Sequence, residues 1–199
     1  MRRSRPVPLL VAVLVGPVLL GLAGCATTSG TASPTDVGAT DAAAQSPAPL
    51  VLTSPDLDAD GALPPWASGV YSTVCDGENR SPALAWEGGP DDVASYLLTL
   101  TDPAHPDYVH WVVTGIPGDV DGVKQGEQGE IGVGVAGRSY RGDGLYAGPC
   151  VPGNTYVYTL YALDEAIEGD ASTTLDDALA LVDGHVLAEA TLDVTPTAP

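Results

Sequence analysis

Two aspartates and two histidines lie close together in one short stretch of the chain. These residues are Asp102, His105, Asp107 and His110, and only one further histidine, His185, occurs in the whole sequence. The Asp-x-x-His pattern occurs twice and offers oxygen and imidazole ligands for a metal ion, although the spacing matches no diagnostic metal motif. A histidine beside an aspartate also suits a general base. A histidine donor with backbone amides nearby suits recognition of phosphate or a similar anion.

Spacing alone leaves these possibilities open. No Gly-x-Ser-x-Gly segment supplies a nucleophile for a hydrolase, and Ser139 is an ordinary loop serine. An alternative needs no ligand at all. His110 precedes Trp111 in an apolar run, so it could be a core histidine with a satisfied hydrogen bond, and Asp102 could be a turn residue before Pro103.

Two apolar strands must hold this histidine stretch. Residues 95–101 and 109–116 are rich in Val, Leu, Tyr, Trp and Thr, which predicts central strands covered on both faces. Further strands are predicted at 50–53, 156–163 and 186–194. The rest of residues 50–89 is predicted to form strands and turns without a helix, since Pro and Gly interrupt it repeatedly.

One helix is predicted, over residues 174–182. Thr173 and Asp176 have the spacing of a capping box, and Gly184 supplies the stop. The predicted apolar stripe consists of Leu175, Leu179 and Val182.

Two glycine-rich segments complete the prediction. Residues 118–137 read as a long loop with a short strand in the alternation of Ile131, Val133 and Val135. Residues 140–153 contain many Gly and Pro and favour a structured loop that brings backbone N–H groups close to a ligand. The fold class is therefore mainly β, an antiparallel β-sandwich with one or two short helices.

The N-terminus has the composition of an export signal. Arg2, Arg3 and Arg5 precede an apolar run that ends in Leu-Ala-Gly and Cys25. We expect a bacterial lipoprotein signal over residues 1–24, with lipid added to Cys25; an ordinary signal peptide or a single anchor helix is the alternative. Residues 25–49 read as a flexible tether and residues 50–195 as the folded domain. The expected location is the cell membrane, lipid-anchored on its extracytoplasmic face.

The charge of the chain limits its partners. After removal of residues 1–24 the chain keeps four Lys plus Arg against 26 Asp plus Glu, a balance of 4 − 26 = −22. Such a surface repels nucleic acid and anionic headgroups, so we expect no nucleic-acid partner. The solubility of an exported protein also explains this acidity, and that explanation implies no particular function.

Besides Cys25, the chain has two cysteines, Cys75 and Cys150. An exported compartment permits disulfides, so we expect these two cysteines to form one.

The order of motifs resembles the phosphatidylethanolamine-binding proteins, most closely their bacterial Raf-kinase-inhibitor-like branch. The resemblance covers nearly all of residues 50–194. It rests on six motifs in the family's order: Cys75-Asp-Gly-Glu-Asn79, Ser81-Pro-x-Leu-x-Trp86, Asp102-Pro-Ala-His-Pro106, Val109-His-Trp-Val-Val113, Gly148-Pro-Cys150 and the strand that begins at Tyr156.

The resemblance implies a sandwich with an anion pocket at one end. Carried over by position, Asp102 and His110 form its polar centre. The remaining residues that the resemblance implies for ligand binding are Tyr146, Gly148 and Pro149 as one wall and Tyr156 at the floor. His105, in the same loop as Asp102, is a further ligand-binding candidate. Family members bind phosphoryl headgroups or small anions, and several inhibit kinases or proteases, so a protein partner is possible. The resemblance implies neither catalysis nor a cofactor. A metal-dependent or acid/base hydrolase that uses Asp102, His105, Asp107 and His110 is the alternative function.

Two departures from the family pattern affect the pocket. Ala104 stands where an acidic residue is usual, and His105 follows it. Residues 151–155 replace the usual Gly-x-His-Arg, so a histidine and an arginine are missing. A charge-assisted hydrogen bond contributes about 1.5 to 3 kcal/mol, so we expect weakened anion binding. His105 is either a loop residue or the replacement for the lost histidine, and the sequence leaves both readings open.

Overall fold

The computed structural model describes residues 47–70, 75–127 and 131–197. The predicted signal peptide, Cys25 and nearly all of the predicted tether lie outside the described residues.

Short strands dominate this part of the chain, with one α-helix and one 3-10 helix. Their order is β1 (Val51–Thr53), β2 (Ala62–Leu63), η1 (Pro65–Ala67), β3 (Arg80–Ser81), β4 (Leu84–Glu87), β5 (Ser95–Thr101), β6 (Val109–Pro117), β7 (Gly122–Val123), β8 (Gly126–Glu127), β9 (Val135–Ala136), β10 (Tyr156–Leu163), α1 (Leu175–Val182) and β11 (Val186–Pro196). Residues 65–67 were expected to form strands or turns, and η1 corrects this because Pro65 sits at its first position, where a missing N–H costs nothing.

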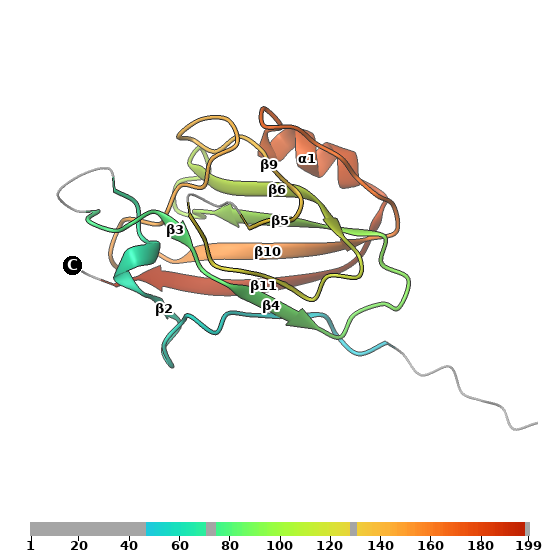
Figure 1. Ribbon diagram of the computed structural model, residues 1–199, viewed down its shortest axis with the longest axis horizontal. Coiled ribbons are helices and arrows are strands. Elements are labelled where there is room, and N and C mark those ends of the chain that lie inside the picture. The colour runs from blue at the N-terminus through green and yellow to red at the C-terminus, as the bar shows by residue number, and fades with distance from the viewer. Residues whose placement is uncertain (1–46, 71–74, 128–130, 198–199) are drawn as a thin grey trace, which may run out of the picture. The chain divides into compact units, whose positions relative to one another are not determined.

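A six-stranded sheet forms the centre of the domain, in the order β2-β11-β10-β5-β6-β9. All of its pairs are antiparallel except β11 with β2, which is parallel. Figure 1 shows the four long strands β6, β5, β10 and β11 side by side. The predicted strands therefore form, and β5 is buried along almost its whole length, as its unbroken apolar run predicts.

Each face of this sheet is covered by a different element. Leu97 and Val112 face a small cluster that includes Ala178 and Val182 of α1. Their neighbours Leu98 and Trp111 face the larger cluster on the opposite side. That cluster also contains buried residues of the three-stranded sheet β1-β4-β7, namely Leu52, Leu84, Trp86 and Val123. In Figure 1 β4 lies across the six-stranded sheet, and α1 lies beside β6 and β9. The architecture is mainly β, with layered sheets as predicted.

The capping box of α1 lies one residue later than predicted. Thr174 is the N-cap, and its hydroxyl accepts a hydrogen bond from the backbone N–H of Asp177, while the Asp177 side chain bonds back to Thr174. Thr173 is used elsewhere, because its Oγ1 accepts the N–H of Asp170 at 2.8 Å. The helix buries Ala178 and Val182 and leaves Leu179 exposed, so the predicted apolar stripe is correct at Val182 and wrong at Leu179.

The glycine-rich segment 118–137 was predicted as a loop with one short strand, but it also contains β7 and β8, which pair with β4 and β3. Ile131 is buried and Val135 is exposed. Only the end of the predicted alternation forms a strand, because β9 pairs through Val135 and Ala136 alone.

Within the described residues, no helix is long and apolar enough to cross a membrane.

Candidate functional site

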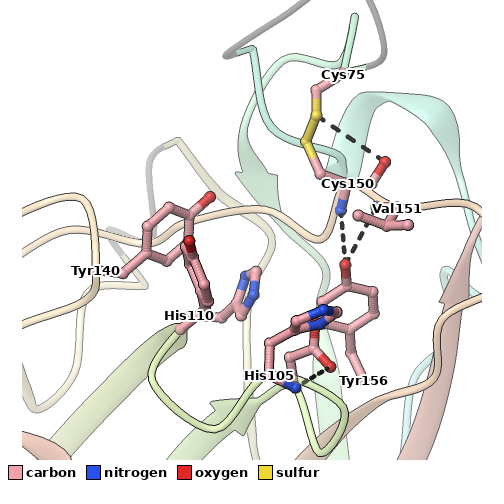
Figure 2. Close-up of a pocket in the computed structure, with 9 residues that line it drawn as sticks. Cys75, His105, His110, Tyr140, Cys150, Val151 and Tyr156 are labelled. Atoms are coloured by element: carbon pink, nitrogen blue, oxygen red, sulfur yellow. Dashed lines mark hydrogen bonds and ion pairs between the residues drawn. A yellow bond between two sulfur atoms is a disulfide. The ribbon is translucent and has the colours of Figure 1, made fainter.

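A cavity of about 310 Å³ opens beside the start of β6. Its lining comes from segments far apart in the chain: Cys75, Asp102, His105, Tyr108, His110, Tyr140, Cys150, Val151 and Tyr156. Figure 2 shows Tyr140 and His110 next to each other, with Tyr156 below the backbone of Cys150 and Val151. The fold thus brings four of the predicted pocket residues, Asp102, His105, His110 and Tyr156, to one cavity.

His110 is held at a break in the strand register. Leu100 pairs with Trp111 and Thr101 with Val109, so His110 is the extra residue of a β-bulge, a feature that redirects a side chain out of the regular alternation. His110 is only 3% exposed, and the Nδ1 of its imidazole lies 2.6 Å from the carbonyl oxygen of Ala147. Burial lowers the pKa of His110, against the opposing effects of the Ala147 carbonyl and of Asp102.

Three tyrosines surround the two histidines. The ring of His110 makes edge contacts with Tyr140 and Tyr156, at centroid distances of 5.1 and 4.9 Å. Tyr108 makes edge contacts with Tyr140 and with His105. These contacts fix the plane of the His110 imidazole, because edge-to-face packing is directional.

Asp102 organises its own loop. The carboxylate is buried, and its Oδ1 accepts the backbone N–H groups of Ala104 at 2.9 Å and His105 at 3.2 Å. Its Oδ2 lies 3.1 Å from the Nδ1 of His105 and 3.5 Å from the Nδ2 of Asn154. A buried carboxylate needs such donors, so Asp102 positions the loop and His105. Asp102 is therefore both a turn residue, through its bonds to Ala104 and His105, and a residue that lines the cavity.

His105 covers Asp102 at the edge of the cavity. Its side chain is 54% exposed, so a ligand could reach it. Asp107 is exposed and does not line the cavity. Within the described residues no group of three or more His, Cys, Asp or Glu side chains could hold a metal ion.

The hydroxyl of Tyr156 joins the floor of the cavity to the loop above it. It accepts the backbone N–H groups of Val151 at 3.1 Å and Cys150 at 3.4 Å (Figure 2). A phenol has one proton to donate and two lone pairs to accept with. Both lone pairs are engaged, so the remaining capacity of Tyr156 is as a donor.

The structure places Tyr146, Gly148 and Pro149 behind the cavity wall, and none of them lines the cavity. Tyr146 is fully buried, and its hydroxyl lies 3.3 Å from the carbonyl oxygen of Ala67. Gly148 lies so close to the backbone of residues 67–69 that a Cβ there would approach the carbonyl oxygen of Ala67 to 2.5 Å. Tyr146, Gly148 and Pro149 lie next to Ala147 in the chain, and Tyr146 and Gly148 pack this segment against residues 67–69. The sequence alone could not show whether these residues line the cavity or hold the segment in place.

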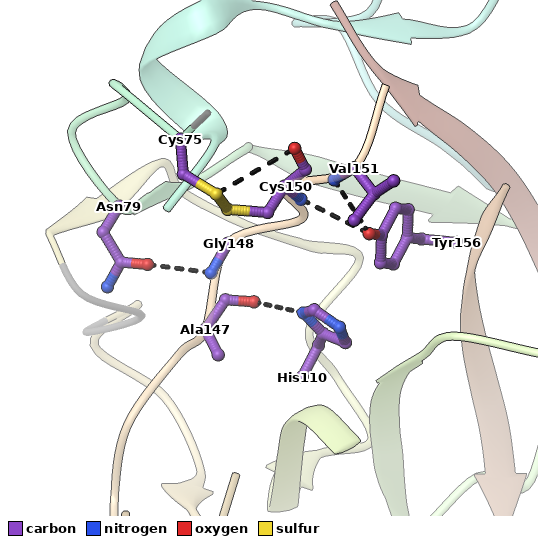
Figure 3. Close-up of a disulfide and its surroundings, with 8 residues drawn as sticks. All are labelled: Cys75, Asn79, His110, Ala147, Gly148, Cys150, Val151 and Tyr156. Atoms are coloured by element: carbon purple, nitrogen blue, oxygen red, sulfur yellow. Dashed lines mark hydrogen bonds between the residues drawn. A yellow bond between two sulfur atoms is a disulfide. The ribbon is translucent and has the colours of Figure 1, made fainter. Parts of the chain in front are cut away.

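The disulfide between Cys75 and Cys150 is formed, and both residues line the cavity. Figure 3 shows it above the segment that carries Ala147 and Gly148. Asn79 holds the same segment through a hydrogen bond from the N–H of Gly148 to its Oδ1 at 2.8 Å. The disulfide and Asn79 therefore fix the strip of backbone that orients His110.

Tyr108, Tyr140 and Asn79 were missed as site residues by sequence reasoning. Asn79 read as part of a turn, and its φ of 54° lies in the left-handed region of backbone conformation. Tyr108 lies inside the histidine stretch, and Tyr140 is the first residue of the glycine-rich loop. The presence of aromatic residues in these two segments was the feature of the sequence that could have indicated them as site residues.

A family described as "Phosphatidylethanolamine-binding protein" matches residues 53–197. The chain belongs to this family. A UPF0098 protein of Methanothermobacter thermautotrophicus is 39% identical over 126 residues, which cover 60% of this chain and 83% of the relative. The Mycobacterium tuberculosis protein named "Putative lipoprotein LppC" is 35% identical over 136 residues, covering 64% of this chain and 63% of the relative.

Solved structures of phosphatidylethanolamine-binding protein homologues share the fold. CT736 of Chlamydia trachomatis is 27% identical with a TM-score of 0.65, covering 76% of this chain and 99% of that structure. YbcL of Escherichia coli has a TM-score of 0.67 at 23% identity, covering 76% and 100%. The fold and the bacterial branch of the phosphatidylethanolamine-binding family are thus as the motifs predicted.

Proposed function

We propose that the chain is a binding module without catalytic activity, whose cavity holds a small anion such as a phosphoryl group. The observation that carries this proposal is the hydroxyl of Tyr156. Two backbone N–H groups occupy its lone pairs, so its proton is available to an acceptor in the cavity. Membership of the phosphatidylethanolamine-binding family supports the same ligand class.

The charges around the cavity predict weak binding. No Lys or Arg is among the described residues that line it, and the carboxylate of Asp102 is within the lining. The guanidinium carbon of Arg141 lies 5.9 Å from the ring centroid of Tyr140, which places a cation next to a lining residue. We therefore expect affinity in the millimolar range, with His105 and His110 supplying the remaining positive charge when protonated.

The proposed location is the outer face of the cell membrane, with lipid attached to Cys25. The basic head, the apolar run and the residues before Cys25 support this, as does the name of the mycobacterial relative. Lipid attachment is tested by the mass of the mature N-terminal peptide. A Cys25→Ser chain is expected to lose the lipid, and an unmodified Cys25 in the native peptide would contradict the proposal.

An NMR titration tests the anion site. Phosphate and phosphoethanolamine are added to the Cys25→Ser chain at millimolar concentration, from about pH 5 to about pH 8, while the His110 ring resonances are followed. Tyr156→Phe is expected to weaken binding at least about fivefold, because it removes the hydroxyl donor and the acceptor of two N–H groups. Tyr161→Phe is the matched control, since Tyr161 is on the same strand and packs against the cluster around α1. Unshifted His110 resonances throughout would refute the anion site.

The contact between His105 and Asp102 favours a hydrolase as the second candidate. A half-exposed imidazole oriented by a buried carboxylate could activate water as a general base. The two cysteines that line the cavity are joined as a disulfide, so water would be the nucleophile. Turnover in a broad ester and phosphoester screen, lost in His105→Gln, would establish this candidate.

A protein partner, such as an enzyme that the chain inhibits, would be recovered stoichiometrically in a pull-down.

A further inference from the structure

The hydrogen bond of His110 decides which of its two nitrogens can meet a ligand. A carbonyl oxygen only accepts, so the Nδ1 that lies 2.6 Å from Ala147 O must carry a proton. In the neutral ring the second nitrogen, Nε2, is then an acceptor. Within the described residues no hydrogen bond is made by Nε2, and the ring lines the cavity. A ligand beside neutral His110 must therefore bring a proton to this nitrogen.

The surroundings of His110 oppose a positive charge on the ring. It is 3% exposed and packed against the edges of Tyr140 and Tyr156. Its burial lowers its pKa, in spite of Asp102. The titratable groups that line the same cavity are Asp102, His105, Tyr108, Tyr140 and Tyr156.

His105 repeats the arrangement at the cavity edge. Its Nδ1 faces the Oδ2 of Asp102 at 3.1 Å, and a carboxylate accepts, so the Nδ1 proton is fixed there too. Its Nε2 is an acceptor whenever the ring is neutral. Tyr156, in contrast, offers a donor. The cavity thus combines imidazole acceptors with a phenol donor.

We propose that this cavity selects a phosphoryl group that still carries a proton, and rejects anions without one, such as sulfate and the phosphodiester of an intact lipid. This inference rests on the proposed anion site and specifies its ligand. The P–OH donates to His110 Nε2, while a second phosphoryl oxygen accepts from Tyr156. A fully ionised oxygen placed against Nε2 would instead set two lone pairs against each other.

Three probes separate the possible sources of the ligand. Inorganic phosphate keeps one P–OH at pH 8, whereas sulfate and glycerophosphoethanolamine, a phosphodiester, have none. Phosphoethanolamine is a monoester whose phosphoryl group gains its proton only near about pH 6. The site should therefore bind free phosphate across the range, the monoester headgroup mainly at low pH, and the diester poorly.

The experiment measures the affinity of each probe for the Cys25→Ser chain at pH 8 and at pH 5.5, at constant ionic strength. At pH 8 phosphate should bind at least about fivefold more tightly than sulfate, because sulfate leaves the buried Nε2 without a donor. This ratio should narrow as the pH falls through the lowered pKa of His110, because the protonated ring donates to either anion. In His110→Gln the ratio at pH 8 should approach one, since an amide both donates and accepts. The control is His185→Gln, which should keep the wild-type ratio. In the wild-type chain the His185 imidazole contacts Asp164 and Glu165.

The outcomes separate this inference from the proposed function. Equal binding of phosphate and sulfate at pH 8 by the wild-type chain would overturn the selection for a proton and leave the anion site standing. Absence of binding by every probe would remove both. The wild-type comparison decides the question even where His110→Gln fails to fold.

Discussion

The side-chain oxygen of Asn79 accepts the backbone N–H of Gly148 at 2.8 Å. The Nδ2 of the same amide donates to the carbonyl oxygen of Tyr146 at 3.0 Å. Asn79 therefore holds the residues on both sides of Ala147, whose carbonyl fixes the proton of His110. A turn residue outside the cavity in this way determines how a cavity histidine meets its ligand.

Replacing Asn79 with alanine should destabilise the domain and release this segment. The change removes the acceptor of the buried Gly148 N–H and a donor to the Tyr146 carbonyl, and losing such a bond to a buried group costs about 1 to 3 kcal/mol. We expect the free energy of unfolding to fall by about 2 to 4 kcal/mol, measured by urea denaturation, since the two costs partly overlap.

Asn79→Gly separates the hydrogen bonds from the backbone conformation. Glycine adopts the φ of 54° without strain, so it relieves the backbone and still removes both bonds. Wild-type stability in both Asn79→Ala and Asn79→Gly would mean that the bonds to Tyr146 and Gly148 contribute nothing. Thr53→Val, which removes an exposed hydrogen bond, should change stability by less than about 0.5 kcal/mol.

Gly148→Ala should disturb the cavity through close packing. A Cβ at this position would lie 2.5 to 2.7 Å from backbone atoms of residues 67–69, which cannot rotate away. We expect a loss of about 1 to 3 kcal/mol in urea denaturation and altered His110 resonances. At Gly153 the φ is 85° and no atom lies within 4 Å of the added Cβ. Gly153→Ala should thus show backbone strain alone, of about 1 to 2 kcal/mol, with His110 unchanged. Unaltered His110 resonances in Gly148→Ala would contradict the supporting role.

The long strands could be predicted because their sequences admit little else. The apolar run of β5 is buried on both faces, and its bounds agree with the prediction. The capping box was displaced by one residue because two threonines adjoin and each has an aspartate three residues away. Only the hydrogen bond from Asp170 to Thr173 decides between them, and spacing does not show it.

The site was predictable where one loop carries it and unpredictable where distant segments meet. Asp102, His105 and His110 are close in sequence, so their types and spacing indicated a site. The contribution of Tyr140 depends on ring contacts with Tyr108 and His110. The distinction between Tyr156, which lines the cavity, and Tyr146, which does not, depends on how each buried ring packs in the folded domain. Both are properties of packing that a single sequence does not contain.

The disulfide should contribute much of the stability of the domain. Cys75 and Cys150 are separated by 75 residues, and closing such a loop stabilises the fold by about 4 to 5 kcal/mol in the chain-entropy model. The double variant Cys75→Ser, Cys150→Ser should lose about this amount in urea denaturation. It should also bind phosphate less tightly, since both residues line the cavity.

Reduction of the wild-type chain is the matching measurement. Its unfolding midpoint should fall toward that of the double variant, whereas the double variant should not respond to reductant. Two free thiols in the unreduced mature chain, found by mass spectrometry, would refute the disulfide.

His110 and His185 should titrate on opposite sides of the ordinary histidine pKa. The pKa of His110 is lowered chiefly by burial. The pKa of His185 is raised chiefly by its hydrogen bond to Asp164, with Glu165 and Asp183 adding to the effect. In an NMR titration of the imidazole protons, assigned with the His110→Gln and His185→Gln variants, His185 should have the higher midpoint and His110 the lower.

The two shifts act on stability in opposite pH ranges. The contribution of His185 is present below its unfolded pKa of about 6.5 and is lost as the pH rises through the raised folded value. The contribution of His110 is present above about pH 6.5 and is lost as the pH falls through the lowered folded value. Compared with the wild type, His185→Gln should therefore be less stable at pH 5.5 and equally stable at pH 9. Equal destabilisation at both pH values would show that His185 acts through packing and not through its charge.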